Sequence, residues 1–211
     1  MSKKLGPVYQ ALFDRFGPQH WWPGDSPWEI AVGAILTQQV AWKNVEKAIG
    51  ALKEKRLLGI DEMIGADAGT IKELIRPVGF YNQKTARLLD FALYVKNHYG
   101  NIEKMLDGET LKVRGELLSL KGIGRETADS ILLYAGRHPI FVIDAYTRRF
   151  AGCIGIDPEQ DYDDLRAVFE SGLERNPQLF NEYHALIVRL GKEHCRTKPL
   201  CEGCPVFPFR K

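Results

Sequence analysis

The sequence predicts an all-α protein. Apolar residues recur at helical spacing through most of the 211 residues, and the alternation typical of half-buried strands is absent. The one apolar run that could form a strand, residues 140–143, is short and serves equally well as an extended connector. Because 45% of the residues are hydrophobic, the chain can bury a sizeable core in one composite domain or two small lobes.

The N-terminal elements are a helix and an aromatic connection. Apolar spacing predicts a helix over residues 5–16. The segment GPQHWWPGDSP that follows contains Trp21 and Trp22. Large aromatic side chains are costly to expose, so these two either pack back on the core or line a concavity for a planar ligand.

Two helical stretches, residues 29–36 and 40–52, are joined at a pair of glutamines, Gln38 and Gln39. Amide side chains need hydrogen-bond partners, which these two could find on base edges or on the helix ends. Trp42 follows three residues after Gln39 and lies near the same helical face.

The middle of the chain continues the helical pattern. Helices are expected at residues 57–76 as a short pair, at 83–99 and at 109–120. Proline and glycine make residues 76–82 a turn. Lys84 and Arg87 could touch phosphate, but we interpret each of them as part of a solvated face.

A glycine hairpin, Lys121-Gly122-Ile123-Gly124-Arg125, precedes a helical segment at residues 126–133. Two glycines one residue apart permit positive φ and leave room for another backbone to approach. The first-turn N–H groups of the next helix, flanked by Lys121 and Arg125, suit a phosphate, although many such turns only end helices. The hairpin is therefore a candidate contact for a nucleic-acid backbone.

The apolar run of residues 140–143 delivers Asp144 to the start of another helical stretch, AYTRRFAG. Asp is a favoured N-cap, and capping alone would explain its position. The alternative is a carboxylate that surrounding donors keep ionised, beside the phosphate-binding hairpin, where it could stabilise a cationic sugar or position water. Two further helices are expected at about 161–174 and 178–193.

These motifs resemble a known family. LKGIGRETADSIL followed by FVIDAYTRR is similar to the helix-hairpin-helix signature of the endonuclease III superfamily of DNA base-excision glycosylases, with its downstream catalytic aspartate. The resemblance runs through nearly the whole chain. It is strongest for the endonuclease III-related group that contains 3-methyladenine DNA glycosylases, through GPQHWWPG, AVGAILTQQVAWKNVEKA, RPVGFYNQKTARL and HALIVRLGKEHC.

The resemblance implies a two-lobed helical HhH-GPD glycosylase fold with a cleft between the lobes. One lobe would comprise residues 25–135 and contain the helix-hairpin-helix at about 112–135. The second helical lobe would comprise residues 1–24 and 136–211, with a C-terminal cysteine loop at 195–204.

An enzyme that acts on a stacked base must flip the nucleotide out of the duplex. The resemblance implies that the hairpin holds the DNA backbone through Lys121, Gly122, Gly124 and Arg125. The resemblance assigns Gln39 to the place that the flipped nucleotide leaves in the stack.

Three tryptophans are the expected walls of the base pocket: Trp21, Trp22 and Trp42. Each base–aromatic contact contributes roughly 1–3 kcal/mol. Asp144 is the expected catalytic carboxylate, because loss of the base leaves an oxocarbenium-like sugar that a nearby negative charge stabilises.

Glu126 occupies the position where the bifunctional members of the superfamily carry a lysine that attacks the sugar. A glutamate cannot form a Schiff base, so we expect a monofunctional glycosylase that uses water and leaves an abasic site. Glu126 either hydrogen-bonds the flipped base or helps to position water as a second catalytic residue, or it only complements the helix dipole, typically worth 0.3–1 kcal/mol.

Aromatic walls favour a cationic base through cation–π attraction, and the group resemblance also indicates 3-methyladenine and related N-alkylpurines. The expected partner is double-stranded DNA containing damaged bases. Two alternatives stay open: a glycosylase for another base, such as a mispaired adenine or thymine, and a non-enzymatic DNA-binding module.

Three of the four cysteines gather near the C-terminus: Cys195, Cys201 and Cys204. Their loop resembles the 4Fe-4S loop of the superfamily, which uses four thiolates. The fourth, about six residues beyond Cys204, falls on Arg210. We expect a cluster with an incomplete cysteine set, whose fourth ligand would be exogenous or not a cysteine. The alternatives are a labile cluster, no cluster, or zinc bound by the three cysteines and His194. Cys153 is interpreted as a buried small hydrophobe.

Charge gives no global sign of the partner. The 29 basic and 27 acidic residues leave a net charge of +2, so any basic surface must be local. No apolar run approaches the roughly 18 residues that span a membrane, and the N-terminus lacks a signal-peptide core. We expect a soluble cytoplasmic monomer that associates with the nucleoid when bound to DNA.

Overall fold

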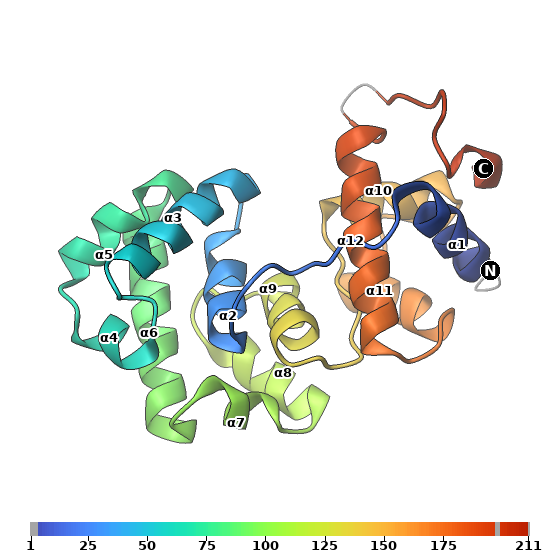
Figure 1. Cartoon of the computed structure of the whole chain (residues 1–211). Helices are drawn as coiled ribbons and strands as arrows, with labels where there is room; N and C mark the ends of the chain where they lie inside the picture. Colours follow the sequence, from blue (N-terminus) through green and yellow to red (C-terminus); the bar gives the residue numbers. More distant parts are fainter. Residues whose placement is uncertain (1–3, 197–198, 211) are drawn as a thin grey trace. The chain divides into compact units, whose positions relative to one another are not determined.

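The computed structural model describes residues 4–196 and 199–210, and every regular element in them is a helix (Figure 1). No strand forms in these ranges, which confirms the all-α prediction. The chain divides into two compact units. One comprises residues 22–136, and the other comprises residues 1–21 and 137–211.

The unit of residues 22–136 is built around α2 (Pro27–Leu36). Ser26 caps this helix through its side chain, and Pro27 suits the first position because its missing N–H would be unpaired there. Nearly all of α2 is buried, as expected for a helix that is apolar all round. It packs on α3 (Trp42–Glu54) and on α6 (Tyr81–Tyr99), as well as on later elements of the unit.

The remaining helices of this unit surround α2 and α6. They are α4 (Ile60–Gly65), α5 (Ala68–Leu74), the 3₁₀ turn η2 (Arg76–Val78) and α7 (Ile102–Leu106). Gly100 caps the C-terminal end of α6. Its φ is 81°, a value that residues with a side chain rarely adopt. Helix α7 was not expected from the sequence, because five residues are too few to show a clear period.

The helix-hairpin-helix consists of α8 (Thr110–Ser119) and α9 (Arg125–Ser130), which continues into the π turn η3 (Ile131–Ala135). A buried ion pair joins the two helices. Arg114 Nε lies 2.6 Å from Asp129 Oδ1, and Arg114 Nη2 lies 3.2 Å from Asp129 Oδ2. This two-point contact fixes the angle at which the hairpin is presented.

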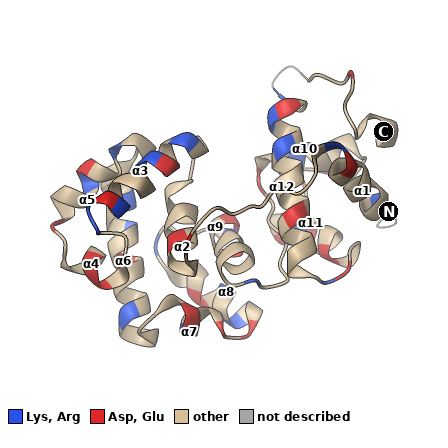
Figure 2. Cartoon of the chain, in the orientation of Figure 1, with Lys and Arg blue, Asp and Glu red and all other residues tan. Residues whose placement is uncertain are grey.

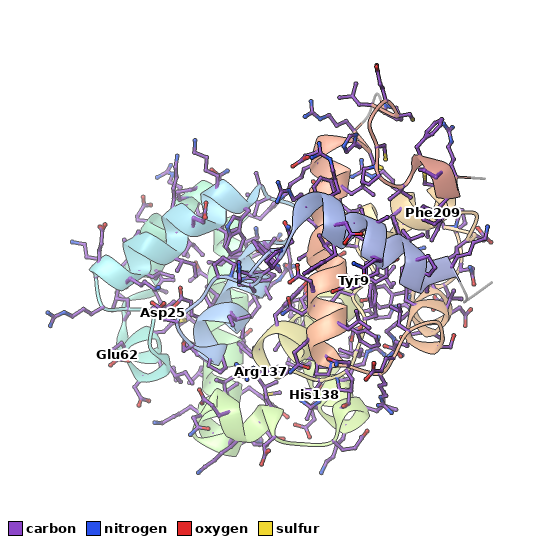
Figure 3. The ribbon with its side chains drawn as sticks, turned by 45° about the vertical axis from the view of Figure 1, so that its right-hand side comes forward. Tyr9, Asp25, Glu62, Arg137, His138 and Phe209 are labelled. Carbon is purple, nitrogen blue, oxygen red and sulfur yellow. The ribbon has the colours of Figure 1, made fainter. Side chains whose placement is uncertain are left out.

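The other unit contains α1 (Leu5–Phe16), α10 (Ala145–Cys153), α11 (Tyr162–Ser171), α12 (Pro177–Glu193) and the 3₁₀ turn η4 (Phe207–Phe209). Its core is aromatic: Phe141 stacks on Phe169 with ring centroids 4.7 Å apart. Tyr9 of α1 lies against α12 (Figure 3). Its ring meets that of Tyr183 edge-on, with ring centroids 5.2 Å apart. A Cβ atom on Gly191 would lie 2.1 Å from the Tyr146 ring, so this glycine lets α10 and α12 approach closely.

The run of residues 140–143 is an extended, buried connector in this core. Its backbone groups bond to side chains instead of a neighbouring strand, since Glu170 accepts from Phe141 N–H, Tyr162 oxygen accepts from Ile143 N–H, and Thr147 donates to Val142 oxygen. A buried segment outside a sheet can persist only with such partners. The connector thereby places Asp144 firmly at the start of α10.

No helix in the described part of the chain is long and apolar enough to cross a membrane. Lys and Arg are spread over the helices of both units and alternate with acidic residues (Figure 2). Charge of one sign therefore does not mark a whole helix as a binding surface.

Candidate functional site

The two glycines of the hairpin differ in backbone conformation and in the space around them. Gly122 has φ 85°, in the left-handed region, whereas Gly124 has φ −90° and ψ 177°, an extended conformation open to any residue. Of the two properties that glycine permits here, Gly122 uses the positive φ and Gly124 uses the absence of a side chain. A Cβ atom on Gly124 would meet nothing within 4 Å, so this position leaves free space in front of the hairpin.

The hairpin also offers hydrogen-bond donors. Within residues 4–196 and 199–210, the N–H groups of Gly122 and Gly124 meet no acceptor. Lys121 and Arg125 are exposed on either side of them. Positive side chains around open N–H groups form a site that a phosphate of a nucleic-acid backbone can occupy.

Gln38 connects the hairpin to the preceding helices. Its Nε2 donates to Gly122 oxygen at 2.9 Å and to Thr127 Oγ1 at 3.0 Å. Arg87 Nη1 in turn donates to Gln38 Oε1, and the Arg87 side chain lies directly under Gly122, where a Cβ atom would be 2.2 Å from its Nε. In the part of the chain that the structure describes, Gln38 is thus the glutamine whose side chain bonds to other protein groups.

Gln39 is the exposed member of the pair. It adopts φ 57°, an uncommon conformation for a residue other than glycine, and its side chain faces solvent. Such a residue costs local strain, and the surrounding structure must hold it in place. This exposure is what the assigned role of entering the DNA stack requires.

Lys84 holds the loop that carries Gln39. Its side chain is 1% exposed, and its Nζ donates to the backbone oxygens of Leu36, Gln38 and Val78 at 2.9, 2.8 and 3.0 Å. The solvated face expected for Lys84 is therefore wrong. Desolvation, with repulsion from Arg87, lowers the pKa of the Lys84 amine to about 8.

Phe80 was not singled out from the sequence. Its side chain is 63% exposed, and it sits at φ 45° directly before α6. Lys84 ties Val78 to Gln38, which brings the turn that carries Phe80 next to the loop that carries Gln39. An exposed ring beside that loop can stack on a base.

Two of the predicted pocket tryptophans are in contact. Trp22 and Trp42 meet edge-on with ring centroids 5.0 Å apart, and Trp22 also lies 5.3 Å from the Tyr134 ring. Gly33 of α2 allows this, because a Cβ atom there would be 3.2 Å from the Trp22 indole. A pocket of about 280 Å³ opens beside both tryptophans.

Carboxylates line this pocket together with the indoles, namely Asp25, Glu29 and Glu46. Lys53 also lines it and pairs with two of them, at 2.8 Å from Asp25 and 2.7 Å from Glu29. Because Lys53 offsets the charge of these two carboxylates, the attraction of this wall for planar, positively charged groups comes mainly from the indole rings.

Trp21 belongs to the unit of residues 1–21 and 137–211. It lines a pocket of about 330 Å³ with residues of α12, among them Arg189 and Lys192. That Trp21 acts together with Trp22 and Trp42 stays a prediction.

Asp144 is the N-cap of α10, and its Oδ1 accepts from Thr147 N–H at 2.7 Å. Its Oδ2 lies 3.6 Å from Nε2 of His184, a buried residue of α12. Burial by itself would raise the pKa of the Asp144 carboxyl, but His184 and Thr147 together hold that pKa below its ordinary value of 3.8. The side chain is 15% exposed, so it is not sealed in the core.

Glu126 is exposed in the first turn of α9. The position complements the dipole of that helix, next to the hairpin. The three C-terminal cysteines are reduced and line one pocket of about 350 Å³, into which Arg210 also projects.

The sequence matches the model of the HhH-GPD superfamily of base excision DNA repair proteins over residues 32–175. The chain belongs to this superfamily. The matched range includes the helix-hairpin-helix, Asp144 and the loop with Gln39, so the family match and the geometry concern the same residues.

Similar proteins and solved structures indicate which class of enzyme within the superfamily the chain resembles. A proposed DNA repair glycosylase of Methanocaldococcus jannaschii is 47% identical over 96% of this chain and 93% of its own length. The structure of an H. pylori 3-methyladenine DNA glycosylase bound to 1,N6-ethenoadenine is 29% identical, with a TM-score of 0.79 over 91% of this chain and 97% of that one. An endonuclease III–DNA complex shares the fold at 19% identity, with a TM-score of 0.84 over 100% of this chain and 95% of that one. We conclude that the protein is a DNA repair glycosylase of the HhH-GPD family.

Proposed function

We propose that this glycosylase is monofunctional and releases N-alkylated purines of the 3-methyladenine type from double-stranded DNA. The observation that carries the proposal is the Asp144 carboxylate, which is ionised, oriented by Thr147 and His184, and still partly exposed. The hairpin would hold the DNA backbone while Asp144 acts on the sugar of the flipped nucleotide.

The reaction needs little from the protein besides charge. The C1′–N bond breaks, the base leaves with the electron pair, and the deoxyribose becomes cationic at C1′. Asp144 stabilises that cation. Water then adds to C1′ and loses a proton to solvent or to a proton-accepting side chain. Electrostatic stabilisation of this kind typically contributes a factor of roughly 10²–10³ in rate.

Two features support an alkylated purine as substrate. Such bases carry positive charge, which suits the indole rings of Trp22 and Trp42 beside the pocket. The H. pylori 3-methyladenine glycosylase, which resembles this chain in sequence and fold, was solved with a modified adenine bound. A cationic base also leaves readily, so the enzyme would not depend on a strong general acid.

The monofunctional mode rests on residue 126. A Schiff-base mechanism needs an amine at the sugar, and this position of the helix-hairpin-helix carries Glu126 instead of lysine. We propose that Glu126 contacts the flipped base or the attacking water.

Gln39 and Phe80 are the proposed fillers of the gap in the DNA stack. Both are exposed at positive φ, and Lys84 fixes the backbone of both turns. Unstacking a base costs a few kcal/mol, which side chains that take its place help to offset.

A panel of duplexes tests the proposal, each containing an alkylated purine, an oxidised pyrimidine or a mispaired thymine, and each analysed with and without alkali. We expect release of the alkylated purine and strand cleavage only after alkali. Excision of oxidised pyrimidines without release of alkylated bases would contradict the substrate class. A borohydride-trapped adduct that a single lysine substitution abolishes would contradict the monofunctional mode.

A further inference from the structure

The fourth cysteine of the chain lies with the other three. Cys153 is the last residue of α10, and Cys195 follows the end of α12. These two thiols line the same pocket of about 350 Å³ as Cys201 and Cys204. Cys153 is half-buried and not enclosed in the core, so its interpretation as a buried small hydrophobe is wrong.

Four thiolates around one pocket repel one another, so they need a positive group between them to be deprotonated together.

The pocket does not suit a single metal ion. In the described residues, no three or more His, Cys, Asp or Glu side chains are grouped as they would be around one ion. Four thiolates on one zinc would have to converge on a common point about 2.3 Å from each sulfur. A cubane cluster instead has one thiolate at each of four iron corners, so its ligands surround a larger volume.

Arginines provide the matching charge. Arg149 and Arg210 line the pocket, and Arg210 Nη1 lies 3.6 Å from the Cys201 sulfur. A 4Fe-4S cluster with four thiolates is negatively charged, and hydrogen bonds to its sulfurs help to stabilise it. Arg210 stands where the family loop has its fourth cysteine, and here it can act as a donor to a ligand sulfur.

We propose that Cys153, on α10, is the fourth ligand of a 4Fe-4S cluster held by Cys195, Cys201 and Cys204. The fourth ligand would then come from α10, the helix that Asp144 caps, instead of from the C-terminal loop. The cluster would then fasten the far end of α10 to the segment that follows α12, and so support the helix that carries the catalytic carboxylate. Such a role is structural and involves no redox step.

The test is metal content after anaerobic reconstitution of the full chain with ferrous iron and sulfide. We expect about four irons and four sulfides per chain in the wild-type protein, together with the broad visible absorbance of a cluster. Cys153→Ala should lose at least one iron per chain and most of that absorbance. Because iron, sulfide and absorbance are measured directly, the result does not depend on glycosylase activity.

A compensating variant separates loss of a ligand from loss of the fold. Cys153→Ala combined with Arg210→Cys restores the family spacing, and it should regain about four irons. Helix content by circular dichroism should be the same in Cys153→Ala and in metal-free wild-type protein. The proposal is overturned if Cys153→Ala keeps the wild-type iron, sulfide and spectrum, or if the wild-type protein takes up zinc without sulfide.

Discussion

Asp144 caps a helix, and its side chain is also the one to which we assign the proposed chemistry. One oxygen caps α10 through Thr147 N–H, and the other faces His184. The two interpretations left open by the sequence are therefore compatible, because a capping carboxylate that is partly exposed can also meet a substrate. His184 was missed, although its spacing from Phe180 and Ile187 places it on the buried stripe of α12.

The lowered pKa of Asp144 sets the direction of its pH dependence. A carboxyl whose pKa is lower in the folded protein stabilises the fold above its unfolded pKa, and that contribution is lost as the pH falls through the folded pKa. We expect the difference in unfolding free energy between wild type and Asp144→Asn to be constant above about pH 5 and to shrink below about pH 4. Urea unfolding between pH 3 and 7 measures it, and a difference that grows on acidification would contradict the assignment.

Lys84 provides a second test at single-residue scale. Lys84→Met removes the donor to three backbone oxygens, and each unpaired buried group costs about 1–3 kcal/mol, so we expect a loss of about 2 kcal/mol or more in unfolding free energy. Lys96→Met on the same helix is the control. Lys96 forms a largely exposed pair with Asp61, worth about 1 kcal/mol or less. Equal stability of the two variants in urea would contradict the anchoring role.

A signal for Lys84 was present in the sequence. Lys84, Leu88, Phe91 and Val95 follow one another at helical spacing, and all four are buried. This spacing places the lysine on the buried face of α6, together with its apolar neighbours. Its three backbone partners could not be predicted, because they come from two turns that only the folded chain brings together.

At the scale of elements, the helix-hairpin-helix was predicted from its glycines, and the structure has it between α8 and α9. The pattern did not distinguish the two glycines, since φ depends on what lies beneath each one. Arg87 lies under Gly122, whereas Gly124 faces open space. The Arg114–Asp129 pair also escaped prediction, because its partners are 15 residues apart on different helices.

The two glycines should therefore respond differently to alanine. Gly122→Ala forces a side chain into the left-handed region and against Arg87, so both stability and DNA binding should fall, stability by about 1 kcal/mol or more. The free energy of unfolding of Gly124→Ala should lie within about 0.5 kcal/mol of the wild-type value. If a phosphate approaches its N–H group, that variant should still bind DNA more weakly.

Thermal unfolding and fluorescence anisotropy on one duplex separate these outcomes. Unchanged DNA affinity in Gly124→Ala would mean that the open space in front of the hairpin is not used by the strand. Unchanged stability in Gly122→Ala would contradict the packing of Arg87 beneath it.

At the scale of the whole molecule, the chain forms two helical units, each with its own core. The glycine hairpin and the pair Trp22–Trp42 belong to one unit, and Asp144, Trp21 and the cysteines belong to the other. The proposed reaction needs residues of both units on the same DNA. Sequence motifs could name these residues one by one, but which of them touch within a unit, such as Trp22 with Trp42, follows only from the fold.

The most direct test of the proposed mechanism compares wild type with Asp144→Asn on a duplex that contains an alkylated purine. Asparagine caps a helix about as well as aspartate, so the substitution removes the charge and leaves α10 capped. The two quantities to measure are the single-turnover rate of base release and the DNA affinity at several salt concentrations. We expect the rate to fall roughly a hundredfold or more, while the affinity and its salt dependence stay unchanged. Base release by Asp144→Asn at nearly the wild-type rate would contradict the central role of this carboxylate.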